Sequence, residues 1–163
     1  MPERIALYPG SFDPVTRGHL DILDRACLIF DRVVIGVLQN PSKIPLFTTE
    51  ERVELIRRSI DGSGRVEVDT FDGLTVDFAQ RVGAIAIVRG LRVTSDFENE
   101  FQMTLMNRRL NPDIHPVFLM TSYSNVFITS SSITEVFRLG GTIDDAVPPA
   151  CAEALHRKFA RDG

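Results

Sequence analysis

Features that define several large classes of protein are scarce or missing in this chain of 163 residues. Its two cysteines, Cys27 and Cys151, lie far apart at apolar helical positions, which is typical of reduced core thiols rather than of a disulfide or a metal pair. No apolar run is long enough for a membrane-spanning helix. Glu3, Arg4 and the break at residues 10–13 interrupt the apolar run that a secretory signal needs. The sequence therefore predicts a cytoplasmic protein.

Lysine is nearly absent, and the overall charge is negative. Among 18 basic residues the only lysines are Lys43 and Lys158, and the formal net charge is −4. This balance does not favour binding to nucleic acid or to an anionic membrane through general electrostatic attraction. Local positive groups must therefore hold any anionic ligand, which draws attention to Lys43, a lone lysine between two prolines in a loop.

Segments typical of strands and of helices alternate along the chain. The expected strands are residues 4–8, 33–38, 66–68, 84–88 and 117–120, and the expected helices are 20–30, 49–60, 74–82, 95–110, 131–139 and 148–160. Most of these strands are apolar on both faces, as in a parallel sheet covered by helices on both sides. The length and the 44% hydrophobic content suit one substantial core. We expect an α/β fold in one domain, residues 1–163, with a Rossmann-like, doubly wound, five-stranded parallel sheet.

Residues 8–19 place a hydroxyl group, two glycines and a histidine where the first strand meets the first helix. Free N–H groups and the helix dipole favour a bound anion at such a helix N-terminus. The stretch lacks the Gly-x-Gly-x-x-Gly fingerprint of dinucleotide-binding proteins and the Gly-Lys-Ser/Thr of a Walker loop. The chain also shows no nucleophile elbow and no cluster of metal ligands. What remains is Thr-x-Gly-His at residues 16–19.

Thr-x-Gly-His resembles the signature of the nucleotidyltransferase superfamily that carries a His/Thr-x-Gly-His motif. Within it, the opening Tyr-Pro-Gly-Ser-Phe-Asp-Pro-x-Thr-x-Gly-His is similar to that of the phosphopantetheine adenylyltransferase family. The similarity continues in order through residues 40–43, 47–52, 89–92, 96–100, 106–108 and 127–131. It implies transfer of the adenylyl group of ATP to 4′-phosphopantetheine, giving dephospho-coenzyme A and pyrophosphate. Two alternatives stay open: a related transferase with another phosphorylated acceptor, such as nicotinate mononucleotide, and a noncatalytic nucleotide-binding module on the same fold.

The resemblance implies three catalytic residues. His19 would stabilise the charge that grows on the phosphates in the transition state, and Ser11 and Lys43 would contact the reacting phosphates. The incoming phosphate monoester is already ionised near neutral pH, so in-line attack needs no general base. The protonation state of His19 stays open, because a helix N-terminus disfavours the cation while bound ATP favours it. As ordinary structural residues, His19 would be a cap, Ser11 a turn residue and Lys43 a solvated lysine.

The resemblance also implies contacts to the two substrates. The acceptor would touch Ser11, Lys43, Leu74, Thr75 and Arg89. ATP would touch Ser11, Phe12, His19, Gly90, Leu91, Arg92, Glu100, Asn125, Val126, Phe127, Ile128, Thr129, Ser130 and Ser131. Residues 89–92 are expected to form a tight turn that sends both arginines into one pocket. For three of these sets an ordinary structural role is the alternative to a substrate contact: a helix start at residues 74–75, a solvated charge at residue 100 and a simple N-cap at residues 129–131.

Two positions depart from the family pattern, and the resemblance also implies a metal ion and an oligomer. Asn99 stands where many members of the family have tyrosine, and residues 125–126 replace a common aromatic-Ser pair, so adenine contacts from these segments are in question. Mg²⁺ is expected to enter with ATP, because no carboxylate is an obvious dedicated ligand. The family implies a homohexamer, with apolar residues of the 95–110 helix, namely Phe101, Met103, Leu105 and Met106, as weak support. Neither nucleic acid nor a membrane is expected as a partner.

Overall fold

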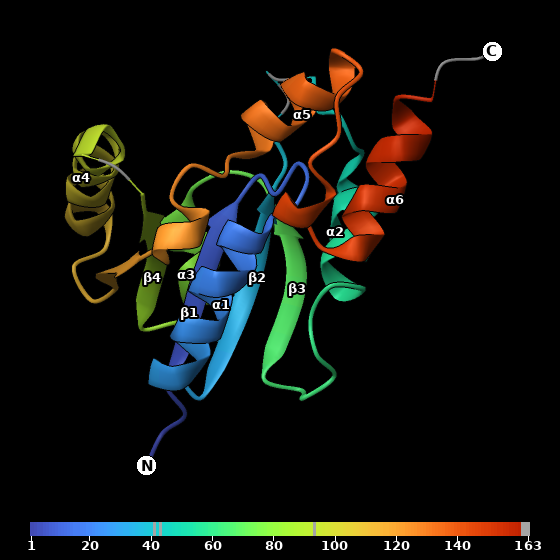
Figure 1. The fold of residues 1–163 in the computed structure, drawn as a ribbon. Helices are drawn as coiled ribbons and strands as arrows, with labels where there is room; N and C mark the ends of the chain where they lie inside the picture. Colours follow the sequence, from blue (N-terminus) through green and yellow to red (C-terminus); the bar gives the residue numbers. More distant parts are fainter. Residues whose placement is uncertain (41, 43, 93, 161–163) are drawn as a thin grey trace.

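A computed structural model describes residues 1–40, 42, 44–92 and 94–160 (Figure 1). Its strands are β1 (Ile5–Gly10), β2 (Arg32–Leu38), β3 (Val66–Phe71), β4 (Ala86–Leu91) and β5 (His115–Met120). Its α-helices are α1 (Arg17–Ile29), α2 (Thr49–Arg57), α3 (Thr75–Arg81), α4 (Thr94–Leu110), α5 (Ser130–Arg138) and α6 (Pro149–Lys158). Two short 3₁₀ helices are η1 (Tyr123–Asn125) and η2 (Asp144–Ala146). No helix in the described part of the chain is long and apolar enough to cross a membrane.

All five strands are parallel, in the order β3-β2-β1-β4-β5, which confirms the expected doubly wound sheet. Alternate side chains of the strands, most clearly those of β1, β2 and β4, enter two separate cores. Ala6 and Tyr8 of β1 pack with residues of α1, α2, α5 and α6 on one face of the sheet. Ile5 and Leu7 pack with α3 on the other. Helix α4 lies beside the β4–β5 edge (Figure 1).

The order of the strands reverses between β1 and β4, and the ladder between these two strands is short. β1 pairs with β2 along six positions, up to Gly10↔Val37, but with β4 only at Ala6↔Ala86 and Leu7↔Ile87. The two strands therefore stop pairing before they reach their carboxyl ends. A crevice at this switch point is where doubly wound sheets bind their ligands.

The boundary of β4 corrects one expectation. Residues 89–91 are not a turn after the strand but part of it, since β4 pairs with β5 as far as Leu91↔Met120. Gly90 is required there for close packing rather than for a turn, because a Cβ atom at this position would lie 2.9 Å from Cγ1 of Ile22 in α1. The boundary of β3 also differs from expectation, because this strand runs to Phe71 instead of ending at Val68. The burial of its side chains alternates, as expected for a strand at the edge of the sheet.

Three expectations from the sequence are confirmed: the start of α1, the start of α2 and the free thiols of the two cysteines. Thr48 caps α2, and its hydroxyl and the Glu51 carboxylate accept hydrogen bonds from each other's backbone N–H groups. The first helix begins at Arg17, so Gly18 and His19 lie in its first turn, at the helix N-terminus where the sequence placed them. Both cysteines are free thiols, as predicted; Cys151 is buried, whereas Cys27 is only partly buried.

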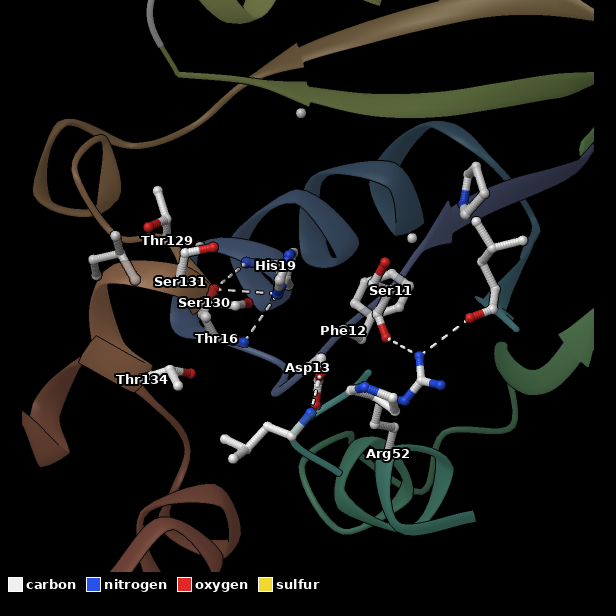
Figure 2. A pocket seen from close by; sticks show the side chains of 18 of the residues that line it. Ser11, Phe12, Asp13, Thr16, His19, Arg52, Thr129, Ser130, Ser131 and Thr134 are labelled. Atoms are coloured by element: carbon white, nitrogen blue, oxygen red, sulfur yellow. Dashed lines mark hydrogen bonds between the residues drawn. The ribbon is translucent and has the colours of Figure 1, made fainter. Parts of the chain in front are cut away.

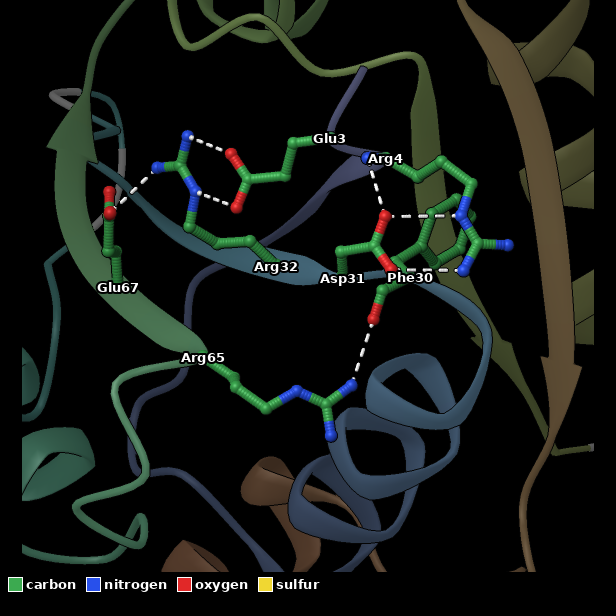
Figure 3. A network of polar contacts seen from close by, with 7 residues as sticks. All are labelled: Glu3, Arg4, Phe30, Asp31, Arg32, Arg65 and Glu67. Carbon is green, nitrogen blue, oxygen red and sulfur yellow. Dashed lines mark hydrogen bonds and ion pairs between the residues drawn. The ribbon is translucent and has the colours of Figure 1, made fainter. Parts of the chain in front are cut away.

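A network of charged side chains joins the strands at the amino-terminal end of the sheet (Figure 3). Arg32 of β2 contacts the carboxylates of Glu3 and Glu67. Arg4 forms two side-chain hydrogen bonds with Asp31 and donates its backbone N–H to the same carboxylate. These contacts link residues next to β1, β2 and β3, far from the crevice.

Candidate active site

A cavity of about 790 Å³ opens at the carboxyl ends of β1 and β4. It brings together predicted site residues that are far apart in the sequence: Ser11, Phe12, His19, Arg89, Gly90, Arg92, Glu100, Ile128, Thr129, Ser130 and Ser131. Figure 2 shows His19 and the residues of the α5 start on one side of this cavity and Ser11 with Arg52 on the other. The switch point thus gathers most of the expected residues into one pocket.

His19 sits in the first turn of α1, where a reciprocal cap holds its ring. The backbone N–H of Thr16 donates to Nδ1 of His19 at 3.0 Å, and the backbone N–H of His19 donates to the Thr16 hydroxyl at 3.2 Å. Because Nδ1 accepts a hydrogen bond, the neutral ring carries its proton on Nε2. The helix start therefore selects the tautomer that leaves Nε2–H as a donor.

The surroundings of His19 keep it neutral. Burial, followed by the positive charges of Arg92 and Arg89, lowers the pKa of His19 from 6.5 to about 3. A neutral imidazole with a fixed Nε2–H can donate a hydrogen bond to a phosphate oxygen without carrying a charge of its own. Of the two opposing influences expected from the sequence, the surroundings that the chain itself provides favour the neutral ring.

The N-terminus of α5 forms a second wall of the cavity. Thr129 is its N-cap and accepts the backbone N–H of Ser132 at 3.0 Å, so one member of the hydroxyl run is an ordinary cap. The Ser130 hydroxyl donates to the carbonyl of Pro14 at 2.8 Å and ties α5 to the corner that follows β1. Thr134, Glu135 and Arg138 also line the cavity, one and two helical turns after Ser131. Their helical spacing from the serine run is the signal that could have predicted them.

Arg89 and Arg92 reach the cavity from β4 and the residue after it. Arg89 forms a forked pair with Glu100, with Nε to Oε2 at 2.8 Å and Nη2 to Oε1 at 2.6 Å. Its third nitrogen, Nη1, donates to the carbonyl of Pro9 at 2.7 Å, across the gap where β1 and β4 no longer pair. Arg92 donates to the carbonyl of Ile128 at 3.3 Å. The pair with Arg89 shows that Glu100 is not a merely solvated carboxylate.

A smaller cavity of about 360 Å³ lies beside the large one and shares Ser11, Arg89 and Glu100 with it. Thr75 lines this second cavity, as does Asn99 of α4. Leu74 lines neither cavity: it is the N-cap of α3 and is half exposed.

Several predicted residues stand apart from the large cavity. Leu91, Asn125, Val126 and Phe127 do not line it, and the Phe127 side chain is 80% exposed. The segment that contains residues 125–128 nevertheless packs against α1, because a Cβ atom on Gly18 would lie within 4 Å of the carbonyls of Asn125 and Ile128. Lys43 lies outside the described residues.

Sequence reasoning missed the roles of Asp13 and Arg52. The carboxylate of Asp13 accepts the backbone N–H groups of Leu46 and Phe47 at 2.8 and 2.9 Å, so it joins two loops rather than only shaping its own turn. Arg52 is buried at the wall of the large cavity. Both residues lie in blocks that carry the family resemblance, but those blocks do not reveal their partners, which are distant in the sequence.

The sheet with its switch point, and the two helix N-termini around one cavity, define an α/β domain of nucleotidyl-transferring type. In agreement, residues 7–136 match the cytidylyltransferase-like family. The chain is 51% identical over 160 residues to the phosphopantetheine adenylyltransferase of Geobacter sulfurreducens, covering 98% of each chain. It is 49% identical over 158 residues to that of Caldanaerobacter subterraneus, covering 97% of this chain and 99% of the other. The chain therefore belongs to the phosphopantetheine adenylyltransferase family of nucleotidyltransferases.

A solved structure supports the fold. A bifunctional NMN adenylyltransferase/ADP ribose pyrophosphatase from Francisella tularensis superposes with a TM-score of 0.73 at 15% identity. The match covers 99% of this chain and 51% of that one. At this identity the likeness shows a shared fold, and nothing about shared substrates follows from it.

Proposed function

We propose that this enzyme transfers the adenylyl group of ATP to 4′-phosphopantetheine and releases dephospho-coenzyme A and pyrophosphate, as the name of its family implies. The observation that carries the proposal is the position of His19. A neutral ring with its Nε2 proton available lies at the start of α1, in the same cavity as the start of α5. Two helix N-termini and a hydrogen-bond donor suit a polyphosphate chain.

In the proposed reaction, an oxygen of the acceptor phosphate attacks the α-phosphorus of ATP, and the bond from that phosphorus to the bridging oxygen breaks. The leaving pyrophosphate takes the electron pair. His19 donates a hydrogen bond to the phosphate oxygens as their charge grows, and no proton needs to be removed from the nucleophile. The hydroxyls and N–H groups of Thr129, Ser130 and Ser131 at α5, with Arg92, hold the triphosphate. Phe12, Gly90 and Ile128 line the same cavity and complete the proposed ATP contacts. For Leu91 and residues 125–127, which do not line it, contact with ATP stays a prediction from the family resemblance.

The acceptor would approach from the smaller cavity. Ser11 and Arg89 line both cavities, so they lie where the acceptor phosphate and the nucleotide would meet. We assign Lys43 to the acceptor phosphate on the strength of the family resemblance, together with Leu74 and Thr75 near the pantetheine arm. Glu100 would orient Arg89 through the forked pair and contact the nucleotide side of the cavity.

We propose that Mg²⁺ arrives bound to ATP. The carboxylates of Asp13, Glu100 and Glu135 line the large cavity, and each already accepts hydrogen bonds from the protein. The described residues contain no group of three or more His, Cys, Asp or Glu side chains that could hold a metal ion. These side chains therefore fit a metal carried by phosphate oxygens better than a protein cage.

A cytoplasmic homohexamer is the assembly that we propose from the family resemblance. Support for an oligomer comes from α4, whose apolar residues are exposed in the single chain: Phe97, Phe101, Met103, Leu105, Met106 and Leu110. An apolar surface of this kind marks an interface more often than a solvated face. Light scattering coupled to size-exclusion chromatography would measure the mass: six chains are expected, a smaller oligomer would contradict the hexamer, and a monomer would contradict any assembly through α4.

Pyrophosphate release tests the reaction. The protein is incubated with ATP and Mg²⁺, and its rate with 4′-phosphopantetheine is compared with the rates with nicotinate mononucleotide and glycerol phosphate. We expect release with 4′-phosphopantetheine alone. Release with another acceptor would indicate a related transferase, and ATP binding without any release would indicate a noncatalytic module.

A further inference from the structure

A buried guanidinium group joins the ends of two strands behind the site (Figure 2). Arg52 of α2 is only 4% exposed. Its Nη1 donates to the carbonyls of Ser11, at 2.8 Å, and Leu38, at 3.2 Å, and its Nη2 donates to the Thr49 hydroxyl at 3.1 Å. Ser11 directly follows β1 and Leu38 ends β2, so one side chain ties the two loops that follow these strands.

The charge of Arg52 is not balanced by a carboxylate in the described part of the chain. Its recorded partners are two carbonyls and a hydroxyl, and its Nε is buried without a hydrogen-bond partner. Burying a charge without a carboxylate partner costs free energy, which the hydrogen bonds to the two carbonyls and the hydroxyl must offset. The partners of Arg52 are therefore mainly backbone groups, and its role is to hold that backbone in place.

A second guanidinium holds the same corner from the other side. Arg89 donates to the carbonyl of Pro9, two residues before the carbonyl that Arg52 holds. The two arginines thus donate hydrogen bonds to the backbone carbonyls on either side of Gly10. Ser11, one of the two residues held in this way, lines both cavities. Unlike Arg52, Arg89 has a carboxylate partner, in Glu100.

We infer that Arg52 is a positioning residue for adenylyl transfer, which rests on the proposed function. It sets Ser11 relative to the start of the loop that follows β2, the loop that contains Lys43 in the sequence. The far end of this loop is tied to the same corner by the Asp13 carboxylate. The triphosphate walls, at the starts of α1 and α5, make no recorded contact with Arg52. Because Ser11 also lines the large cavity, loss of Arg52 should disturb the groups that meet the acceptor more than it disturbs ATP binding.

The test compares Arg52→Lys with Arg57→Lys, an exposed arginine in the last turn of the same helix. Lysine keeps the charge but lacks the planar fork that bridges two carbonyls and a hydroxyl. For Arg52→Lys we expect kcat/KM for 4′-phosphopantetheine to fall at least tenfold, with the Kd for ATP within twofold of the wild type. Hydrogen–deuterium exchange should accelerate in peptides that span residues 10–13 and 37–40. Arg57→Lys should change none of these quantities.

Three outcomes would overturn the inference: wild-type rates in Arg52→Lys, unchanged amide exchange, or equal losses of ATP affinity and acceptor kcat/KM. If Arg52→Lys does not fold, Thr49→Val removes only the hydrogen bond to Nη2 and should give the same pattern at smaller amplitude. If the wild type itself transfers no adenylyl group to 4′-phosphopantetheine, the proposed function fails. Amide exchange then decides by itself whether Arg52 ties the two loops together.

Discussion

The Nδ1 atom of His19 accepts the backbone N–H of Thr16 at 3.0 Å, while the Thr16 hydroxyl caps the helix that carries the histidine. The two residues that cap helix α1 thus include the proposed catalytic residue, His19. The cap decides which ring nitrogen carries the proton, so the chemistry available to His19 follows from a local backbone hydrogen bond.

Replacing His19 should impair turnover more than nucleotide binding. We expect His19→Ala to lower kcat by about 10²–10³-fold, the typical loss when one donor to a developing charge is removed. The Kd for ATP should change much less, because the hydrogen bond strengthens as charge develops in the transition state. Steady-state kinetics and calorimetric titration with ATP measure the two quantities. His115→Gln, at an exposed position, is the control, and equal losses in kcat and ATP affinity for His19→Ala would make His19 a ground-state ligand.

The low pKa of His19 predicts a specific dependence of stability on pH. The folded chain keeps His19 neutral down to about pH 3, whereas the unfolded chain protonates it below its ordinary value of 6.5. Protons then favour the unfolded state, so this residue lowers the free energy of unfolding as pH falls below 6.5, by up to about 1.4 kcal/mol per pH unit.

Urea unfolding of the wild type and of His19→Asn at several pH values isolates this effect, because other titrating groups cancel in the difference. The wild type should lose stability relative to the variant between pH 6.5 and pH 4. A difference that stays constant over that interval would contradict the lowered pKa of His19. Nitrogen-15 chemical shifts of the ring should also show a proton on Nε2 and none on Nδ1 at neutral pH.

Gly90 should not tolerate a side chain. A Cβ atom there would lie 2.9 Å from Cγ1 of Ile22, so Gly90→Ala should destabilise the fold by about 1–3 kcal/mol through overpacking. Thermal unfolding measures this. The double variant with Ile22→Ala should lose less stability than the sum of the two single variants, because the shortened side chain relieves the contact. Gly62→Ala is the control, since a Cβ atom there meets nothing within 4 Å; simple additivity in the double variant would argue against the clash.

Asp31 should contribute to stability at neutral pH and lose that contribution in acid. Hydrogen bonds from the side chain and the backbone of Arg4 lower its pKa from 3.8 to about 2. A depressed carboxyl pKa stabilises the folded state above pH 3.8, and this stabilisation disappears as pH falls through 2. Asp31→Asn should therefore be less stable than the wild type at pH 7, with the gap closing between pH 4 and pH 2. Asp72→Asn, at an exposed residue without a recorded side-chain hydrogen bond, should show no such convergence.

The sequence predicted the layered fold because alternating apolar segments and helix caps are local signals. It also located the cavity at the carboxyl ends of the strands, since parallel strands bring the loops that follow them to one edge of the sheet. It failed where the outcome depends on neighbours: β4 runs through residues 89–91 because β5 pairs with it. The partners of Asp13 and Arg52 are likewise set by tertiary structure, at separations that no periodicity reports.

The early end of the β1–β4 ladder has a consequence for how this site can evolve. Beyond Leu7 and Ile87 the two strands exchange no ladder hydrogen bonds, and the nearest recorded bridge is the Arg89 side chain on the carbonyl of Pro9. Elsewhere in the sheet the backbone ladder sets the spacing between strands, but at this seam the Arg89 side chain bridges the two strands. A substitution at residue 89 would therefore act on the width of the crevice and on the proposed acceptor contact at the same time.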